Sequence, residues 1–204
     1  MAKLYFYYSA MNAGKSTTLL QSSYNYVERG MQVLLFAPEF DMHEEGPTIH
    51  SRIGLKQQAC GFHKETDFYE ATSKYIETLP SLKCLLIDEA HFLTKAQVKQ
   101  LTHITTKLHL PVLCYGLRSD FKGEPFQGSI YLLAWAEELS EIKTICHCGK
   151  KATMNLRIDA QGNPIEDGEQ ILIGGNENYT SVCMTHFREQ NMLFAESYDS
   201  VGVL

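Results

Sequence analysis

The residues with the most specific chemistry lie near the beginning of the chain, in Ser9–Ser16, which reads SAMNAGKS. An apolar run, Lys3–Tyr8, precedes this segment and a helix-like stretch follows it, which is the strand–loop–helix context of a P-loop. Backbone N–H groups of such a loop surround the phosphates of a nucleoside triphosphate, and the following helix directs its positive end at the same anion. Lys15 would add a charge for the β- and γ-phosphates, and the Ser16 hydroxyl can bind Mg²⁺. The sequence therefore predicts phosphoryl transfer or hydrolysis, although Ser9 stands where the motif usually begins with Gly.

Two acidic residues, Asp88 and Glu89, directly follow the apolar run Leu85–Ile87. Downstream of a P-loop this is the Walker B position, where Asp88 would hold Mg²⁺. Glu89 points in a different direction and can accept a proton from the attacking oxygen. Asp88–His91 also spells the acidic box of some helicases, but such motors use two nucleotide-binding domains and a basic track for the strand. This acidic chain has room for one such domain, so the sequence argues against a motor.

Thiol and imidazole side chains in the last third of the chain are spaced as metal ligands. Cys146 and Cys148 form one close pair, and Cys183 and His186 form a second pair much later in the chain. Two close pairs joined by a long excursion are typical of a tetrahedral Zn²⁺ site, and four protein ligands leave no open position, so the role would be structural. His147 is a competing donor. The alternative is a set of reduced, metal-free cysteines in a small core. Small lobes often need a bound metal for stability, however, which favours zinc.

The segments that must position these residues alternate between strands and helices. Besides the first strand, continuous apolar runs predict strands at Gln32–Ala37, Lys83–Asp88 and Pro111–Tyr115, and spacing predicts helices after the P-loop and at Thr66–Leu79, Thr94–Leu108 and Ser129–Leu139. Pro38–Gly61 is richer in polar residues, Gly and His, and is interpreted as a loop. The alternation predicts an α/β fold, a P-loop parallel sheet with helices on both faces.

The character of the chain changes near Lys143, where short strand-like runs divided by turn signals begin. They predict a small zinc-binding, β-rich lobe. We expect a nucleotide-binding domain at residues 1–142, this lobe at residues 143–192 and a tail at residues 193–204. If zinc pins its base, Gly149–Val182 would be a loop that can close over a ligand, and Gly174 and Gly175 would let its backbone approach that ligand closely.

Composition and charge limit the classes of function. With 204 residues, of which 44% are hydrophobic, the chain can build one sizeable core and a small additional lobe. A net charge of −6 argues against a broad nucleic-acid surface, which usually carries a basic stripe. The apolar start is too short to cross a bilayer and lacks the form of a secretory signal, so we expect no membrane partner. The six cysteines are then expected to be reduced, in a cytoplasmic protein.

Taken together, the motifs resemble those of bacterial type II thymidine kinases, a P-loop, zinc-containing family. The similarity extends over nearly the whole chain and rests on SAMNAGKS, SSYNYVERGM, SRIGL, LLIDEAHFL, PVLCYGLRSDFKGEPF, GSIYLLAWAEEL, IKTICHCGKKATM and GEQILIGGNENYTSVC. The resemblance implies that ATP with Mg²⁺ phosphorylates thymidine, and deoxyuridine, at the 5′ oxygen, giving dTMP in nucleotide salvage. It also implies a homotetramer that is inhibited by thymidine triphosphate (dTTP).

The resemblance also assigns roles to single residues. Glu89 would be the catalytic base, and Ser16 and Asp88 would hold Mg²⁺. The ATP site would comprise Ser9, Ala10, Met11, Asn12, Ala13, Gly14, Lys15, Ser16, Arg52, Asp88, Glu89, Ala90 and His91. The thymidine site would comprise Met11, Phe92, Leu117, Phe121, Phe126, Gln170, Ile171, Leu172, Ile173, Gly174 and Tyr179, the last six in a lasso-like loop over the base. The aromatic residues of this expected thymidine site follow predicted strands or lie in the loop Gly149–Val182. Open α/β sheets bind ligands at the ends of their strands, so these positions agree with a ligand site.

Two other functions stay open at this point. Another small-molecule kinase or an NTPase would use the same scaffold, and the dependence of ATP consumption on thymidine would separate it from a thymidine kinase. A nucleotide-sensing binding module would bind ATP without turnover. Glu89 argues against the binding module, because a protein that only binds ATP has no need of a second acid.

Overall fold

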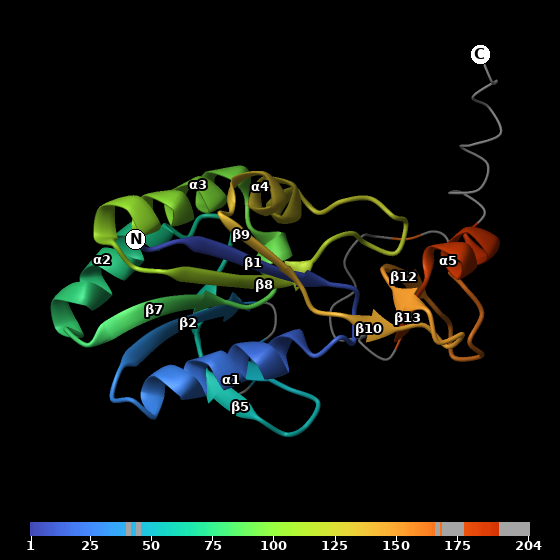
Figure 1. The fold of residues 1–204 in the computed structure, drawn as a ribbon, viewed down its shortest axis with the longest axis horizontal. Coiled ribbons are helices and arrows are strands. Elements are labelled where there is room, and N and C mark those ends of the chain that lie inside the picture. The colour runs from blue at the N-terminus through green and yellow to red at the C-terminus, as the bar shows by residue number, and fades with distance from the viewer. Residues whose placement is uncertain (40–41, 44–45, 166–167, 169–177, 192–204) are drawn as a thin grey trace, which may run out of the picture.

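A six-stranded parallel sheet forms the centre of the computed structural model, which describes residues 1–39, 42–43, 46–165, 168 and 178–191 (Figure 1). In spatial order, the strands are β6 (Cys60–Phe62), β2 (Gln32–Pro38), β7 (Leu82–Ile87), β8 (Val112–Leu117), β1 (Leu4–Ser9) and β9 (Glu138–Glu141). Each neighbouring pair runs parallel. The α/β prediction and the strands predicted from apolar runs are therefore confirmed.

Helices cover both faces of this sheet (Figure 1). On one face lies α1 (Lys15–Val27), which follows the P-loop. On the other face lie α2 (Phe68–Thr78), α3 (Lys95–His103) and α4 (Gln127–Trp135). A turn of π-helix, Ile104–Leu108, extends α3. Among the described residues, no helix combines the length and apolar character needed to cross a bilayer.

The core of the sheet is apolar on both faces, as expected for a parallel sheet between helices. Leu85, Leu86 and Ile87 of β7 are fully buried, and they belong to two clusters on opposite sides of the sheet. Cys84 and Cys114 are also fully buried, so their thiols fill the core. This rigid centre carries the loops that follow β1, β7 and β8.

The interpretation of Pro38–Gly61 as a loop was wrong. The segment contains β3 (Met42–His43), β4 (Gly46–His50) and β5 (Lys56–Gln58), which form a small antiparallel sheet, and it ends in β6. These strands are short and mostly half-exposed, so they have no continuous apolar run. Their backbone pairing holds them together, and this pairing leaves little trace in the sequence.

The predicted helix Ser129–Leu139 was wrong in its last third. Helix α4 ends at Trp135, and Ala136 already has extended dihedral angles. Glu138–Glu141 instead forms the edge strand β9, whose register pairs Leu139 with Phe6 of β1. Most of β9 is exposed, so it lacks the apolar run of a buried strand, and its position is decided by the free edge of β1.

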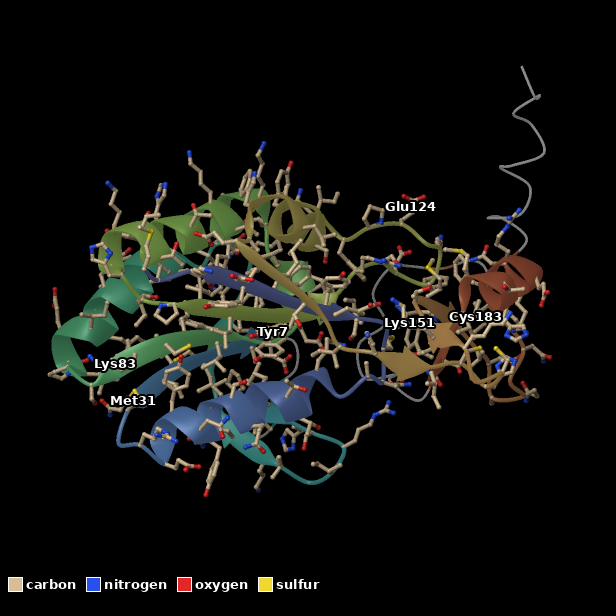
Figure 2. The ribbon with its side chains drawn as sticks, in the orientation of Figure 1. Tyr7, Met31, Lys83, Glu124, Lys151 and Cys183 are labelled. Carbon is tan, nitrogen blue, oxygen red and sulfur yellow. The ribbon has the colours of Figure 1, made fainter. Side chains whose placement is uncertain are left out.

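A small lobe follows β9 and contains β10 (Thr144–Ile145), β11 (Lys151–Ala152), β12 (Met154–Arg157), β13 (Tyr179–Val182) and α5 (Met184–Gln190). It has its own core of buried side chains, among them Met154, Leu156, Val182 and Phe187. The lobe lies at the carboxyl ends of the parallel strands; Figure 2 shows Cys183 of the lobe at the end opposite Met31 and Lys83. The predicted domain boundaries stay predictions, and residues 193–204 lie outside the described part of the chain.

Candidate functional site

The P-loop connects β1 to α1 and turns sharply twice. Asn12 and Gly14 have left-handed backbone angles, with φ of 61° and 85°. Gly14 is the N-cap of α1, and a residue with a Cβ would be strained there. Ser9 and Lys15 are buried, with 4% and 8% of their surfaces exposed. The loop therefore curls around the amino end of α1, as a phosphate-binding loop must.

Asp88, at the end of β7, contacts the P-loop directly. The Ser16 hydroxyl donates a hydrogen bond to Asp88 Oδ2 at 3.1 Å, and the Glu89 N–H donates to Asp88 Oδ1 at 3.0 Å. A hydroxyl and a carboxylate at this distance are hard oxygen ligands of the kind that Mg²⁺ prefers. The residues present therefore fit a magnesium ion at the predicted position.

Glu89 and His91 adjoin Asp88 at the end of β7. Glu89 Oε2 lies 3.3 Å from His91 Nδ1, and the side chain of Glu89 is 31% exposed. Burial, and next the charge of Lys15, hold the pKa of His91 well below its usual range, so the imidazole is neutral and the contact is not an ion pair. The Leu117 N–H of β8 donates a hydrogen bond to His91 Nδ1, at 3.2 Å. The imidazole thus ties the end of β7 to the end of β8.

A cavity of about 360 Å³ brings together most of the predicted ATP residues, but Ser9, Ala10, Asp88, Ala90 and His91 do not line it. It is lined by residues 11–17, residues 50–53, Glu89 and Leu117. Arg52 reaches it from the loop after β4, and its Nη2 donates a hydrogen bond to Asn12 Oδ1. His50 was missed by the sequence analysis, because Pro38–Gly61 had no interpretable pattern apart from SRIGL. The cavity places Lys15, Arg52 and Glu89 around one space.

The predicted base-pocket aromatics form two groups beyond this cavity. Phe92 and Phe126 meet edge to face at 5.8 Å between ring centroids, and Phe126 also packs on His91. Phe121 and Tyr179 form the second edge-to-face pair, at 6.4 Å. Phe121 and Phe126 are almost fully buried, whereas Phe92 and Tyr179 are half-buried. Gln170–Gly174 lie outside the described residues.

The sequence analysis missed two residues that contact the P-loop from the small lobe. Asn155 Oδ1 accepts a hydrogen bond from the Met11 N–H at 2.7 Å, and the Ser181 hydroxyl donates to the Met11 carbonyl. The sequence hint for Asn155 is a polar amide between two apolar strand residues, Met154 and Leu156. This pattern alone does not identify the contact with the P-loop, which is seen only when the neighbours of the strand in the fold are known.

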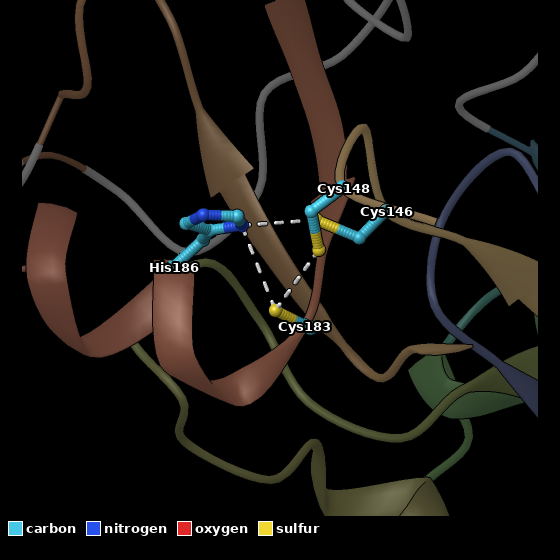
Figure 3. A group of neighbouring side chains, drawn as sticks. All are labelled: Cys146, Cys148, Cys183 and His186. Atoms are coloured by element: carbon cyan, nitrogen blue, oxygen red, sulfur yellow. Dashed lines mark hydrogen bonds between the residues drawn. The ribbon is translucent and has the colours of Figure 1, made fainter. Parts of the chain in front are cut away.

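The predicted metal ligands converge in the lobe (Figure 3). The ligand atoms of Cys146, Cys148, Cys183 and His186 all lie within 4.8 Å of one another. His186 Nδ1 lies 3.2 Å from Cys146 Sγ and 3.6 Å from Cys183 Sγ. His147 stacks against His186 at 4.2 Å between ring centroids. Three thiols and one imidazole in this arrangement can hold a tetrahedral Zn²⁺. Sulfur is a soft ligand that suits zinc, and four protein ligands leave no coordination position open.

The surroundings of the cluster favour a thiolate. Burial by itself raises the pKa of Cys146, but hydrogen bonds from the Cys148 backbone N–H and from His186 outweigh it and lower the pKa to about 6. The hydrogen bond to Cys146 raises the pKa of His186, because the imidazole and the thiol share a proton here. The thiolate is the form of cysteine that binds metal, so the lowered pKa of Cys146 agrees with a metal site.

Comparison with known proteins identifies thymidine kinases that are similar to this chain over almost its whole length. A family model described as thymidine kinase matches residues 2–187. The chain is 61% identical over 188 residues to the thymidine kinase of Coxiella burnetii, which covers 92% of this chain and 96% of that protein. It is 57% identical over 189 residues to the thymidine kinase of Yersinia pestis, with coverage of 93% and 96%. The thymidine kinase of Legionella pneumophila strain Lens is 60% identical over 188 residues, with coverage of 92% and 90%.

Proposed function

Because the chain belongs to the thymidine kinase family, we propose that it transfers the γ-phosphoryl group of ATP to the 5′-hydroxyl of thymidine. The products are dTMP and ADP. The observation that carries this proposal is the cavity in which Glu89 faces the P-loop and Lys15. A phosphate-binding loop and a partly exposed carboxylate around one space are what an in-line transfer to an alcohol requires.

The proposed mechanism assigns a step to each group. The loop N–H groups and Lys15 bind the phosphates and offset the charge that develops during transfer. Glu89 takes the proton of the 5′-hydroxyl while that oxygen forms its bond to the γ-phosphorus, and the bond to the ADP oxygen breaks. Mg²⁺, when bound by Ser16 and Asp88, supplies positive charge to the β- and γ-phosphates. Arg52, which also lines the cavity, is proposed to bind a phosphate oxygen.

The base pocket is proposed on the family resemblance and on the aromatic groups. The Phe92–Phe126 pair would form one wall of this pocket, and the Phe121–Tyr179 pair would form another. Flat aromatic faces near a catalytic carboxylate suit a pyrimidine ring. Met11, Leu117 and residues 170–174 complete the proposed pocket, which would accept deoxyuridine as well as thymidine.

The remaining features of the proposal concern cofactors and assembly. The cluster of Cys146, Cys148, Cys183 and His186 is proposed to bind a structural Zn²⁺. Feedback inhibition by dTTP and a homotetramer are proposed from the family. All six cysteines are free thiols, which supports the cytoplasm as the proposed location.

A coupled assay tests the proposed function. ADP formation is measured with ATP and Mg²⁺, with and without thymidine, deoxyuridine or another nucleoside, and dTMP is identified by mass spectrometry. We expect ADP formation to depend strictly on thymidine or deoxyuridine. ATP consumption without a nucleoside, or with an unrelated one alone, would contradict the proposal and favour an NTPase or a different kinase.

A further inference from the structure

The hairpin of β12 and β13 holds both backbone polar groups of Met11. The Met11 N–H donates to Asn155 Oδ1 at 2.7 Å, and the Met11 carbonyl accepts from the Ser181 hydroxyl. We call Asn155 and Ser181 together the Met11 clamp. Since Met11 belongs to the P-loop, the clamp joins the small lobe to the phosphate-binding loop.

The geometry of the hairpin explains why these two side chains act on one residue. Asn155 and Ser181 are directly opposite each other in the antiparallel register. Side chains of a strand alternate between its faces, and the neighbouring Met154, Leu156 and Val182 are buried in the core of the lobe. Asn155 and Ser181 therefore point away from that core and toward the P-loop.

The Asn155 side chain is almost completely buried, with 2% of its surface exposed, and both ends of its amide are hydrogen-bonded. Its Oδ1 accepts from Met11, and its Nδ2 donates to the carbonyl of Ser119 at 3.0 Å. The two bonds fix which end of the amide faces the loop. Burying an amide gains little stability over an apolar side chain of the same shape, so stability alone gives little reason for an amide here.

The clamped residue lies where the loop needs support. Asn12, the next residue, has a left-handed backbone conformation, which asparagine tolerates better than most residues with a Cβ but less well than glycine. Its Nδ2 donates to the Tyr179 carbonyl of the same hairpin at 3.2 Å. The conformation of Met11 and Asn12 sets the direction from which the following N–H groups, up to Ser16, approach a phosphate.

We propose that the Met11 clamp positions the P-loop for ATP, so that Asn155 and Ser181 are positioning residues of the nucleotide site. This inference rests on the proposed function for the identity of the nucleotide. Without the clamp the loop samples several conformations, and ATP binding must restore the competent one, which lowers the apparent affinity.

Two variants of Ser181 provide the decisive comparison, because valine and threonine have the same shape and differ by one hydroxyl. Binding of the non-hydrolysable ATP analogue AMP-PNP with Mg²⁺ is measured by calorimetry, and KM for ATP is measured in the kinase assay. We expect Ser181→Val to weaken analogue binding about tenfold, since a lost bond leaves the Met11 carbonyl without its donor. Ser181→Thr keeps the hydroxyl and should bind within about twofold of the wild type. KM for ATP should follow the analogue affinity, while kcat at saturating ATP changes little.

Asn155→Leu removes the other half of the clamp without changing the size of the side chain much. We expect a similar loss of analogue affinity, and in the double variant with Ser181→Val the total loss should be smaller than the product of the two, because both act on Met11. Thr180→Val is the matched control, since Thr180 is the neighbour of Ser181 and points to the opposite face of β13. It should bind the analogue as the wild type does.

The outcomes separate the clamp from a merely structural role. Unchanged analogue affinity in Ser181→Val would overturn the proposal, and so would an equal loss in Ser181→Thr, because the hydroxyl would then not matter. Should Asn155→Leu fail to fold, the Ser181 pair still decides the question. Analogue binding is measured without thymidine, so an absence of thymidine phosphorylation in the wild type would contradict the proposed function and not the clamp.

Discussion

At the scale of the residue, the backbone of Glu89 stands out. Its φ of 47° is rare for a residue with a side chain and costs on the order of 1–3 kcal/mol. The Glu89 N–H bonds to the Asp88 carboxylate, and the Glu89 carbonyl accepts from the Phe92 N–H at 3.0 Å. This sharp turn lets consecutive acids diverge, so that Asp88 meets Ser16 while Glu89 lines the cavity. The strained turn therefore separates the two proposed roles, metal ligand and base.

Replacement of Glu89 tests the role of the base. We expect Glu89→Gln to lower kcat by roughly two to four decades, the range typical for loss of a general base, because an amide cannot take the proton of the 5′-hydroxyl. Affinity for AMP-PNP should stay near that of the wild type. Glu77→Gln, at an exposed position of α2, is the control and should retain activity. Near-full activity of Glu89→Gln would show that another group accepts the proton.

The two cations of the cavity should differ in importance. Lys15 is 8% exposed and belongs to the loop itself, whereas Arg52 is exposed and reaches the loop through Asn12. We expect Lys15→Met to reduce kcat/KM by at least about a hundredfold, a typical loss for one preorganised charge, and Arg52→Met to reduce it less. Steady-state kinetics with varied ATP measure both. An Arg52→Met variant that is more impaired than Lys15→Met would reverse the proposed roles.

At the scale of the element, α4 packs unusually closely against the turn that follows Glu89. A Cβ added to Gly128 would lie 2.5 Å from the Ala90 carbonyl oxygen and 2.8 Å from that of His91. Such distances are too short for any side chain, and the atoms met are backbone that cannot swing away. The first turn of α4 therefore fixes the position of the turn at residues 89–92, and with it the carboxylate of Glu89.

Gly128→Ala should consequently impair catalysis from outside the cavity. We expect a loss of stability on the order of 1–3 kcal/mol, as for other overpacked sites, together with a lower kcat. Thermal unfolding and kcat at saturating substrates measure the two effects. Gln127→Ala, at the exposed neighbouring position, is the control and should be neutral in both. Unchanged kcat in Gly128→Ala would mean that the turn tolerates displacement.

The small lobe should depend on its metal. We expect one Zn²⁺ per chain in the purified protein, and Cys183→Ala or a strong chelator should remove it and unfold the lobe. Because β13 precedes Cys183 and carries Ser181, both thymidine and AMP-PNP binding should weaken. Cys60→Ala, outside the cluster, is the control and should retain zinc. Metal analysis, limited proteolysis and calorimetry test this; active protein without zinc would contradict it.

At the scale of the whole molecule, one side of α1 remains open. Tyr24 and Val27 of α1 are 62% and 51% exposed, and Leu55, beside β5, is 42% exposed. Large apolar side chains gathered on one surface are typical of an interface between proteins. This surface lies on the face of the sheet that α1 covers, away from the α2–α4 layer (Figure 1). It supports the proposed assembly of several copies of the chain.

Light scattering should therefore find a particle of four times the 23.1 kDa of one chain. Tyr24→Glu places a charge in the exposed apolar surface and should shift the particle to a smaller assembly, because burying an unpaired charge is costly. Glu28→Gln, also exposed at the end of α1, is the control and should leave the mass unchanged. A wild-type particle with the mass of one chain would contradict the tetramer.

The local parts of the site were predictable from the sequence for a physical reason. The P-loop, the two acids after β7 and the metal pairs each depend on a few neighbouring residues, whose spacing already fixes which groups can act together. Continuous apolar runs likewise indicated the buried strands, because a strand covered on both faces has no polar side.

Contacts between distant segments could be decided only by the tertiary structure. Arg52 meets Asn12, β9 pairs with β1, and the Met11 clamp reaches the P-loop from β12 and β13. Each contact depends on how the sheet orders its strands and where the lobe docks, and these are set by the packing of the whole chain. The sequence by itself therefore determined which chemical groups the protein has, and the folded chain decided which of them support one another.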